Sequence, residues 1–528
     1  MSDLQPSHFL PLTDNISRGQ ATQWDSDAHI DVDESSGAYE LNVNLEVSSA
    51  DESSAEGTSA CGQTVGEHSG EEFSFYPRWT DERYRATDIW INWLKARLQG
   101  TLPLALSARI PPEVFEFVID KMDPPTLITA AQVCAAWYPR AMHNIYYTVK
   151  ICSRTSFNVL FKQCQTYPTV KQWLASTCKL VVGGDHEHSP FPESAFEDTP
   201  LENKINGNDL FLQALPVALA GLMPRVRIMF IKNARLHFIH TDFPFSISRF
   251  QSIKSLTLRE CRPKNLTQLW RIVSAFPQLT DLTMQDITFT QQSAQSDTGA
   301  SLSRPPSHMR LRSLDVYVVD EYMPMFVDWM TTRSDLCASL ADLTYRSERM
   351  AWTSIQKLLE TAGASLTRYR EGAYDHDGCW IHGHLSQNTA LRSFDFCLDV
   401  ICHEAKYQWQ VPRAAWTKAT DELHSILSTI QSRQLEHIKL VITICSHCTK
   451  LESEHPDRVL EMLDLQDLYE VMSRPYFNTL QVVEVTTEES ITGLTWQSNN
   501  SMRLQKIKAM FHGILQPWSA RGIVTVYF

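Results

Sequence analysis

Apolar side chains take the first, fourth and sixth positions of Ile253-Lys254-Ser255-Leu256-Thr257-Leu258. The polar residues Ser255 and Thr257 alternate with Leu256 and Leu258, which is typical of a β-strand that buries one face. Chance alone matches such a triplet at roughly 40 places in a chain of this composition, so the spacing needs support from its context. Further copies are Leu279-Leu282-Met284, Leu311-Leu314-Val316, Leu340-Leu343-Tyr345, Leu391-Phe394-Phe396, Leu435-Ile438-Leu440 and Leu480-Val483-Val485, with Leu366-Tyr369 as a degraded copy.

The context of these triplets favours a repeat array. Successive triplets start 26, 32, 29, 26, 25, 44 and 45 residues apart. The first five intervals are close to the length of one strand plus one helix, whereas the last two leave room for an insertion or a missed repeat. Helical patterns fall between the triplets, at Leu266–Phe276, Met323–Met330, Ile355–Leu359, Ala415–Ile430 and Asp467–Met472.

Cys261 follows the first triplet at a position where leucine-rich repeats carry Cys or Asn. Residues 151–528 therefore resemble a degenerate leucine-rich-repeat array. This resemblance implies an irregular α/β solenoid of stacked parallel strands with helices outside them. An ordinary α/β domain of alternating elements is the alternative. Two more strands are expected at Lys179–Val182 and Ile523–Phe528, with a long loop over residues 183–208.

The same periodicity predicts a binding surface. Side chains at alternate strand positions point away from the buried face. A solenoid presents these side chains as one continuous surface, which suits a protein ligand. The predicted positions are Thr257, Arg259, Thr283, Gln285, Asp315, Tyr317, Asp395 and Lys439.

Three short helices are predicted near the start of the repeat region. The Pro111-Pro112 pair suits a first helical turn, because N–H groups have no partner there. Asp123 is the expected N-cap of a second helix that starts at Pro124, and Trp137 opens the third. The expected apolar face of the first helix is Val114, Val118, Ile119 and Met122, and that of the second is Leu127, Ala131 and Cys134.

The order of these residues resembles the F-box, whose pattern is Leu-Pro-x-Glu-aliphatic, a Leu-rich middle and Val-Cys-x-x-Trp. The chain departs from it at Ile110, where the family prefers Leu, and at Tyr146-Tyr147, where many members carry Leu-Trp. With weakly patterned repeats behind the box, the chain looks like fungal F-box domain-containing proteins. An unrelated small helical subdomain is the alternative. The matching residues are Pro111, Glu113, Val114, Leu127, Val133, Cys134 and Trp137.

The F-box resemblance implies docking onto the Skp-type adaptor of an SCF-type cullin–RING ubiquitin ligase, and through the adaptor onto cullin. The chain would be the substrate-recognition subunit and not an enzyme, with an unknown client protein on its repeats. An F-box-bearing repeat scaffold without ligase activity is the alternative. The implied adaptor-binding residues are Ile110, Pro111, Pro112, Glu113, Val114, Val118, Pro124, Leu127 and Val133. The implied F-box core is Ile119, Cys134 and Trp137.

The distribution of charged residues separates an acidic N-terminal segment from the rest of the chain. Residues 1–75 hold 15 Asp and Glu against one basic residue, Arg18, whereas residues 76–528 hold 46 of each sign. The acidic segment cannot bury enough apolar surface to fold, so we predict a disordered tail. The balanced remainder argues against nucleic acid as a partner. A helical lead-in is expected over residues 76–104, with Trp90, Trp93, Leu94 and Leu98 on one stripe, before the F-box at 105–150.

Motifs of enzymes and metal sites are scarce. The sequence contains no GxxxxGK phosphate loop, no Gly-x-Ser-x-Gly elbow and no GxGxxG fingerprint. Cys379 with His382 and His384, and Cys445 with Cys448, carry metal-ligand residue types. Neither cluster supplies four closely spaced ligands, so we expect no metal or cofactor. An enzyme within residues 365–450 is the alternative.

No secretory signal and no membrane-spanning run is apparent, so membranes are not expected as partners. Twelve cysteines in 528 residues is ordinary usage and not a disulfide framework. A cytoplasmic or nuclear protein with reduced thiols is expected.

Overall fold

A computed structural model describes ten segments of the chain. They belong to one compact unit that spans residues 73–528. The predicted acidic tail, the lead-in helix and most of the predicted loop over 183–208 lie outside the described residues. The described segments are 110–183, 211–291, 309–318, 321–332, 334–347, 352–373, 382–399, 412–444, 455–489 and 500–527.

The described strands form a single parallel sheet of twelve strands, arranged in chain order. Each strand pairs with the strands before and after it in the sequence, as in a repeat array whose units contact only their neighbours. This order confirms the solenoid and not the alternative of an ordinary α/β domain. The strands are β1 Thr148–Ile151, β2 Lys179–Val182, β3 Ile228–Lys232, β4 Ser255–Arg259, β5 Asp281–Ile287, β6 Ser313–Val318, β7 Asp342–Ser347, β8 Arg368–Ala373, β9 Ser393–Asp399, β10 His437–Ile444, β11 Val482–Glu489 and β12 Val524–Tyr527.

The predicted triplets lie on β4 to β11, and their apolar side chains enter one continuous core. Ile253, Leu256 and Leu258, for example, are each 0% exposed. The degraded copy at Leu366-Tyr369 belongs to β8 and is buried like the others. Strands β1 and β3 were not predicted, although both carry the spacing. The additional triplets are Tyr146-Val149-Ile151, Thr177-Leu180-Val182 and Val226-Met229-Ile231.

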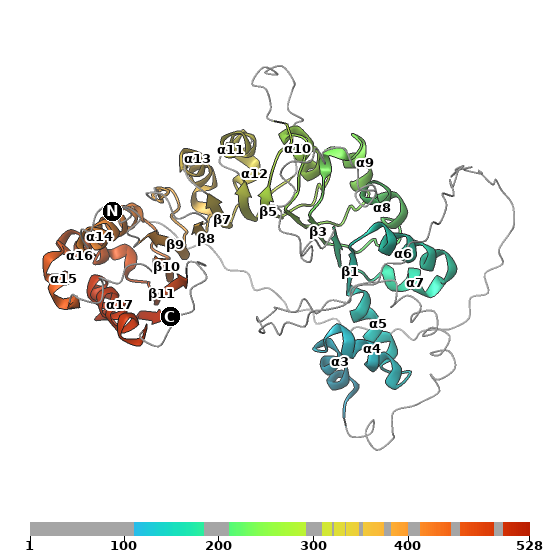
Figure 1. Cartoon of the computed structure of the whole chain (residues 1–528), viewed down its shortest axis with the longest axis horizontal. Coiled ribbons are helices and arrows are strands. Elements are labelled where there is room, and N and C mark those ends of the chain that lie inside the picture. The colour runs from blue at the N-terminus through green and yellow to red at the C-terminus, as the bar shows by residue number, and fades with distance from the viewer. Residues whose placement is uncertain are drawn as a thin grey trace, which may run out of the picture. The chain divides into compact units, whose positions relative to one another are not determined.

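Helices lie along one face of the sheet, as Figure 1 shows. The helical patterns predicted between triplets are confirmed, and α14 and the pair α15 and α16 fill the two longest intervals. Because β9 pairs directly with β10, and β10 with β11, no further strand of the sheet lies between them. The helices are α6 Arg154–Thr166, α7 Pro168–Leu174, α8 Phe211–Leu219, α9 Phe243–Ile247, α10 Leu266–Ser274, α11 Met323–Thr331, α12 Ser334–Cys337, α13 Trp352–Ala362, α14 Pro412–Thr429, α15 Pro456–Met462, α16 Gln466–Met472, α17 Asn500–Ile514 and α18 Gln516–Ser519, with 3-10 turns at Leu236–Phe238, Gly363–Ser365 and Pro475–Phe477.

Side-chain hydroxyls tie consecutive repeats together. A Ser or Thr shortly before the first apolar position of a triplet donates to the backbone carbonyl at that first position in the preceding repeat. Such a bond satisfies a carbonyl that the strand ladder leaves unpaired. The bonds are Ser252 to Val226 at 2.7 Å, Ser339 to Leu311 at 3.0 Å, Ser365 to Leu340 at 2.8 Å, Ser432 to Leu391 at 2.6 Å and Thr479 to Leu435 at 2.9 Å.

The substitution Ser432→Ala is expected to lower the free energy of unfolding by about 1–3 kcal/mol, because it leaves a buried carbonyl without a donor. Ser432 is 1% exposed. Urea denaturation followed by circular dichroism measures the loss. The control is Ser428→Ala, which removes a hydroxyl bonded within α14 and is expected to change stability by less than about 0.5 kcal/mol. Equal effects of the two changes would contradict the role of the inter-repeat bond.

Candidate protein-binding surfaces

Three helices precede the sheet and form what we call the three-helix unit, residues 112–147: α3 Pro112–Asp120, α4 Pro124–Val133 and α5 Tyr138–Tyr147. The side chain of Asp123 accepts a hydrogen bond from the Thr126 backbone N–H at 3.3 Å, and Pro124 starts α4. The predicted cap of the second helix is therefore confirmed. The small core of the unit consists of Ile119, Leu127, Ala130, Ala131 and Ala141.

An ion pair that the sequence analysis missed fixes α3 against α5. The guanidinium of Arg140 donates from Nε to Oδ1 of Asp120 at 2.7 Å and makes a second bond to Oδ2. Asn144 donates to the same carboxylate at 2.9 Å. The hydrogen bond from Arg140 is the main reason why the pKa of Asp120 falls to about 2. The bidentate geometry holds the orientation of α3 relative to α5.

The outer face of α3 is apolar and exposed. Val114, Phe117 and Val118 are 47%, 61% and 46% exposed. Their spacing of i, i+3 and i+4 places them on one side of the helix. Val133, at the end of α4, is 53% exposed. Exposed apolar clusters of this kind mark interaction sites in soluble proteins.

The apolar face expected for the first helix was wrong in part. Ile119 points into the core with Met122, whereas Val114 and Val118 point outward. The inward stripe starts instead at Phe115, whose ring lies 5.7 Å from that of Trp137. Because Phe115, Ile119 and Met122 are spaced i, i+4 and i+7, the helix turns its two valines away from the core.

The implied adaptor-binding residues fall into two groups. Pro111, Pro112 and Glu113 are exposed beside the outer face of α3, while Ile110 and Pro124 are half-buried. Leu127, in contrast, is 4% exposed and packs inside the three-helix core, so it supports the surface from within and is not available for contact. The implied core residues Ile119 and Cys134 are buried, and Trp137 packs against the same core.

The three-helix unit is continuous with the first repeat. Helix α5 ends at Tyr147 and β1 begins at the next residue, inside the range predicted for the F-box. Tyr146 belongs to the core of the array. The rings of Tyr138 and Trp173 meet edge to face, with centroids 6.0 Å apart. Helix α5 therefore packs against the first repeat as well as against α3 and α4.

The second candidate surface is the side of the sheet opposite the helices, which we call the open face. It consists of the outward side chains of the strands, which alternate with the buried apolar positions. The structure places all eight predicted positions on this face, where Arg259 is exposed and the other seven are half-buried. The open face is polar over β6 to β11, where a network of charged side chains crosses the strands.

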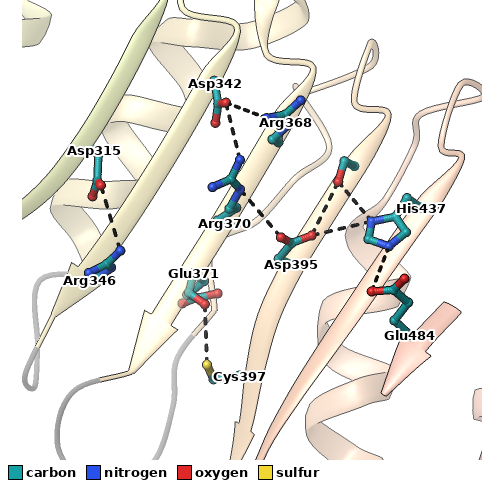
Figure 2. Close-up of polar contacts among 11 residues, drawn as sticks. Asp315, Asp342, Arg346, Arg368, Arg370, Glu371, Asp395, Cys397, His437 and Glu484 are labelled. Carbon is teal, nitrogen blue, oxygen red and sulfur yellow. Dashed lines mark hydrogen bonds and ion pairs between the residues drawn. The ribbon is translucent and has the colours of Figure 1, made fainter. Parts of the chain in front are cut away.

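This network starts with a run of aspartate–arginine contacts (Figure 2). Asp315 on β6 lies 3.9 Å from the guanidinium of Arg346 on β7. Asp342 on β7 lies 3.1 Å from Arg368 and 3.7 Å from Arg370, both on β8. Burial raises the pKa of Asp315, and this outweighs the positive charge of Arg346, which lowers it. Each arginine therefore has a carboxylate on a neighbouring strand.

The network continues toward β11. Arg370 lies 3.7 Å from Asp395 on β9, and Asp395 lies 3.8 Å from Nδ1 of His437 on β10. The other ring nitrogen of His437 lies 3.6 Å from Glu484 on β11. Ser393 is within 3.2 Å of His437 Nδ1. Over these strands the open face supplies its own counter-ions, so its local net charge is small.

A buried ionic cluster lies on the opposite, helix-covered side of β8. Glu371 occupies the third triplet position of that strand, where the other repeats carry apolar residues. Its Oε2 lies 2.9 Å from Nδ1 of His382, and Oε1 of Glu422 on α14 lies 2.5 Å from Nε2. The three side chains are 5–8% exposed. With a carboxylate at each ring nitrogen, both nitrogens carry protons.

Burial lowers the pKa of His382, but the charges of Glu371 and Glu422 and the hydrogen bonds to them outweigh it and raise the pKa from 6.5 to about 10. Among the residues that the structure describes, no group of three or more His, Cys, Asp and Glu is placed to hold a metal ion. Cys379, Cys445 and Cys448, named above as ligand types, lie outside the described residues. His384 is exposed.

The substitution His382→Gln is expected to destabilise the array by about 3–5 kcal/mol at pH 7, because it removes the cation between two buried carboxylates. A raised histidine pKa stabilises the fold fully below pH 6.5, and this contribution is lost as the pH rises toward about 10. The deficit of the variant in urea denaturation therefore shrinks between pH 7 and pH 10. The exposed neighbour serves as a control, since His384→Gln is expected to leave stability unchanged. A deficit that does not depend on pH would argue against a protonated His382.

Comparisons with known proteins identify no family for this chain. No family model matches the chain, and no curated protein matches it. Among solved structures, the leucine-rich repeat-containing protein LegL7 from Legionella pneumophila is similar at 11% sequence identity and a TM-score of 0.32, over 70% of this chain and 98% of that chain. The repeat architecture therefore rests on the sheet described above. Within the described residues no helix is long and apolar enough to cross a membrane.

Proposed function

We propose that the chain is the substrate-recognition subunit of an SCF-type cullin–RING ubiquitin ligase. The observation that carries this proposal is the exposed apolar face of α3, formed by Val114, Phe117 and Val118. It lies at the first helix of a rigid unit whose sequence resembles the F-box. A Skp-type adaptor would cover this face, and cullin would join through the adaptor.

The energetics of such a surface suit a stable complex. Interfaces concentrate their binding energy in a few apolar anchors surrounded by polar residues. Phe117, which the sequence analysis did not single out, is the largest and most exposed of the three anchors at 61%. Exposed Pro111, Pro112 and Glu113 flank the anchors at the start of the helix. The Asp120–Arg140 pair keeps the helix in place before binding, which reduces the ordering cost.

The repeats would hold the client protein. In this role the chain makes and breaks no bonds. It raises the concentration of the client near a ubiquitin-loaded conjugating enzyme, so that a bimolecular encounter becomes local. A protein ligand fits the open face because that face runs over many strands and is lined by charged and polar side chains. The alternative is a scaffold with the same two surfaces that does not join a ligase.

The double substitution Val114→Glu/Val118→Glu is expected to abolish co-elution of the full chain with the Skp-type adaptor in size-exclusion chromatography. Two charges in the apolar contact remove both anchors, each of which contributes about 1–3 kcal/mol. Melting temperature should not change, because both side chains are exposed.

The matched control is Phe245→Glu on α9, where the ring is 76% exposed and far from α3 in sequence; this variant should bind the adaptor like the unmodified chain. Retained binding by a folded Val114→Glu/Val118→Glu variant would exclude the outer face of α3 as the docking surface. Adaptor binding without co-purification of cullin would favour the scaffold.

A further inference from the structure

Strand β12 lies at one edge of the sheet, where it pairs with β11 alone among the described strands. A backbone N–H of β11 donates to the carbonyl of Ile523 at 2.9 Å. Alternate residues of a parallel strand direct both backbone groups to the same side, so Ile523, Thr525 and Tyr527 bond to β11. Val524 and Val526 direct their N–H and C=O groups away from β11. Within the segments that the structure describes, these groups have no hydrogen-bond partner.

The residues of this edge give it little protection against pairing with another strand. Proteins block exposed edge strands with charged side chains, prolines or β-bulges. Residues 523–527 read Ile-Val-Thr-Val-Tyr, without a charge or a proline, and the ladder to β11 is regular over its four residue pairs. Thr525 and Tyr527 are exposed. An edge of β-branched and aromatic residues with free backbone groups is a template for a further strand.

We infer that β12 is a dimerisation strand, which pairs antiparallel with β12 of a second copy of this chain across a two-fold axis. The two sheets then join into one continuous sheet, and each copy covers the free edge of the other. This inference goes beyond the proposed function and does not depend on it, because the adaptor surface on α3 and the edge of β12 share no residue.

The positions of the free backbone groups select the register of this pair. Residues that face each other in an antiparallel pair lie on the same side of the sheet, and hydrogen-bonded pairs alternate with non-hydrogen-bonded pairs. Two-fold symmetry therefore permits a register centred on Val524, Thr525 or Val526. Only the register centred on Thr525 pairs all the free groups within residues 523–527, because each free valine then faces the other. In this register Thr525 lies on the axis and faces the same residue of the second copy.

A second copy suits this edge because the strand is complementary to itself. The register pairs valine with valine, threonine with threonine, and Tyr527 with Ile523, and β-branched and aromatic pairs of this kind stabilise antiparallel strands. No like charges meet, because the strand carries none. Arg521, the preceding charged residue, points back into its own chain and donates to the carbonyls of Phe477 and Leu480 at 2.9 and 2.8 Å. An isologous pair of this kind closes at two copies.

The test is sedimentation velocity of the full chain over about a hundredfold range of protein concentration. A reversible equilibrium between monomer and dimer is expected. The first variant is Val524→Pro, which removes an N–H that points away from β11, so the ladder within the chain keeps its hydrogen bonds while pairing with a second copy is blocked. This variant is expected to raise the dissociation constant of the dimer at least about tenfold.

Charged substitutions at the exposed Thr525 test the register. Thr525→Lys places two like charges opposite each other on the axis and should raise the dissociation constant at least about tenfold, and Thr525→Glu should do the same. An equimolar mixture of these two variants should associate again, because opposite charges then face each other. The matched control is Thr155→Lys at an exposed position of α6, which should leave the dissociation constant within about twofold.

Three results would overturn the inference. A chain that stays monomeric throughout the range does not use the edge for self-association, whether the edge is bare or covered by other residues of the chain. A dimer that Val524→Pro leaves unchanged has its interface elsewhere. A mixture of Thr525→Lys and Thr525→Glu that stays monomeric excludes the register centred on the axis. Thermal unfolding followed by circular dichroism checks that each variant keeps its fold.

Discussion

Each repeat of this array has one apolar side, and a neighbouring repeat is what covers it. The chain-order parallel sheet is the direct result, because every strand must lie beside the strands before and after it in the sequence. The first and last repeats each have one apolar side that no neighbouring repeat covers. At the first strand α5 provides it, with Tyr146, Met142 and Ile145 packed on the array core. At the last strand Trp518 of α18 is 1% exposed and closes the core. The three-helix unit is thus also an end cap, which ties its position to the stability of the repeats.

The fold could be predicted from the sequence because the strand and the helix of each repeat are adjacent in the chain. Triplets flanked by helical patterns were sufficient for β4 to β11, where the apolar period and the helices agree. The first and third strands carry the same spacing, but short triplets recur by chance and no clear helical pattern lies between them. Degraded copies were harder for a physical reason. Thr177 and Glu371 are buried at positions that are apolar in other repeats, so the full triplet is missing at β2 and β8, although the sequence predicted a strand at the first and a degraded copy at the second.

The sequence predicted the buried side chains better than the exposed ones. Val114 and Ile119 are both aliphatic residues of one short helix, yet one faces outward and the other inward. The choice depends on Phe115, whose contact with Trp137 sets the rotation of the helix. Net charge was uninformative in the same way, since a balance of 46 against 46 does not show which acids and bases lie beside one another. The register of the strands is what places Asp342 beside Arg368 and Arg370, and Arg370 beside Asp395.

The buried cluster of Glu371, His382 and Glu422 has a consequence for how the array comes apart. In every other described strand the equivalent position is apolar, from Ile151 to Val526. The ladder between β8 and β9 is also the shortest, with three paired residues. Repeat proteins unfold in cooperative blocks that separate where neighbouring units hold each other least. The cluster crosses this short ladder, because Glu371 lies on β8 and Glu422 on α14, so the array depends on a protonated His382 to hold the repeats on its two sides together.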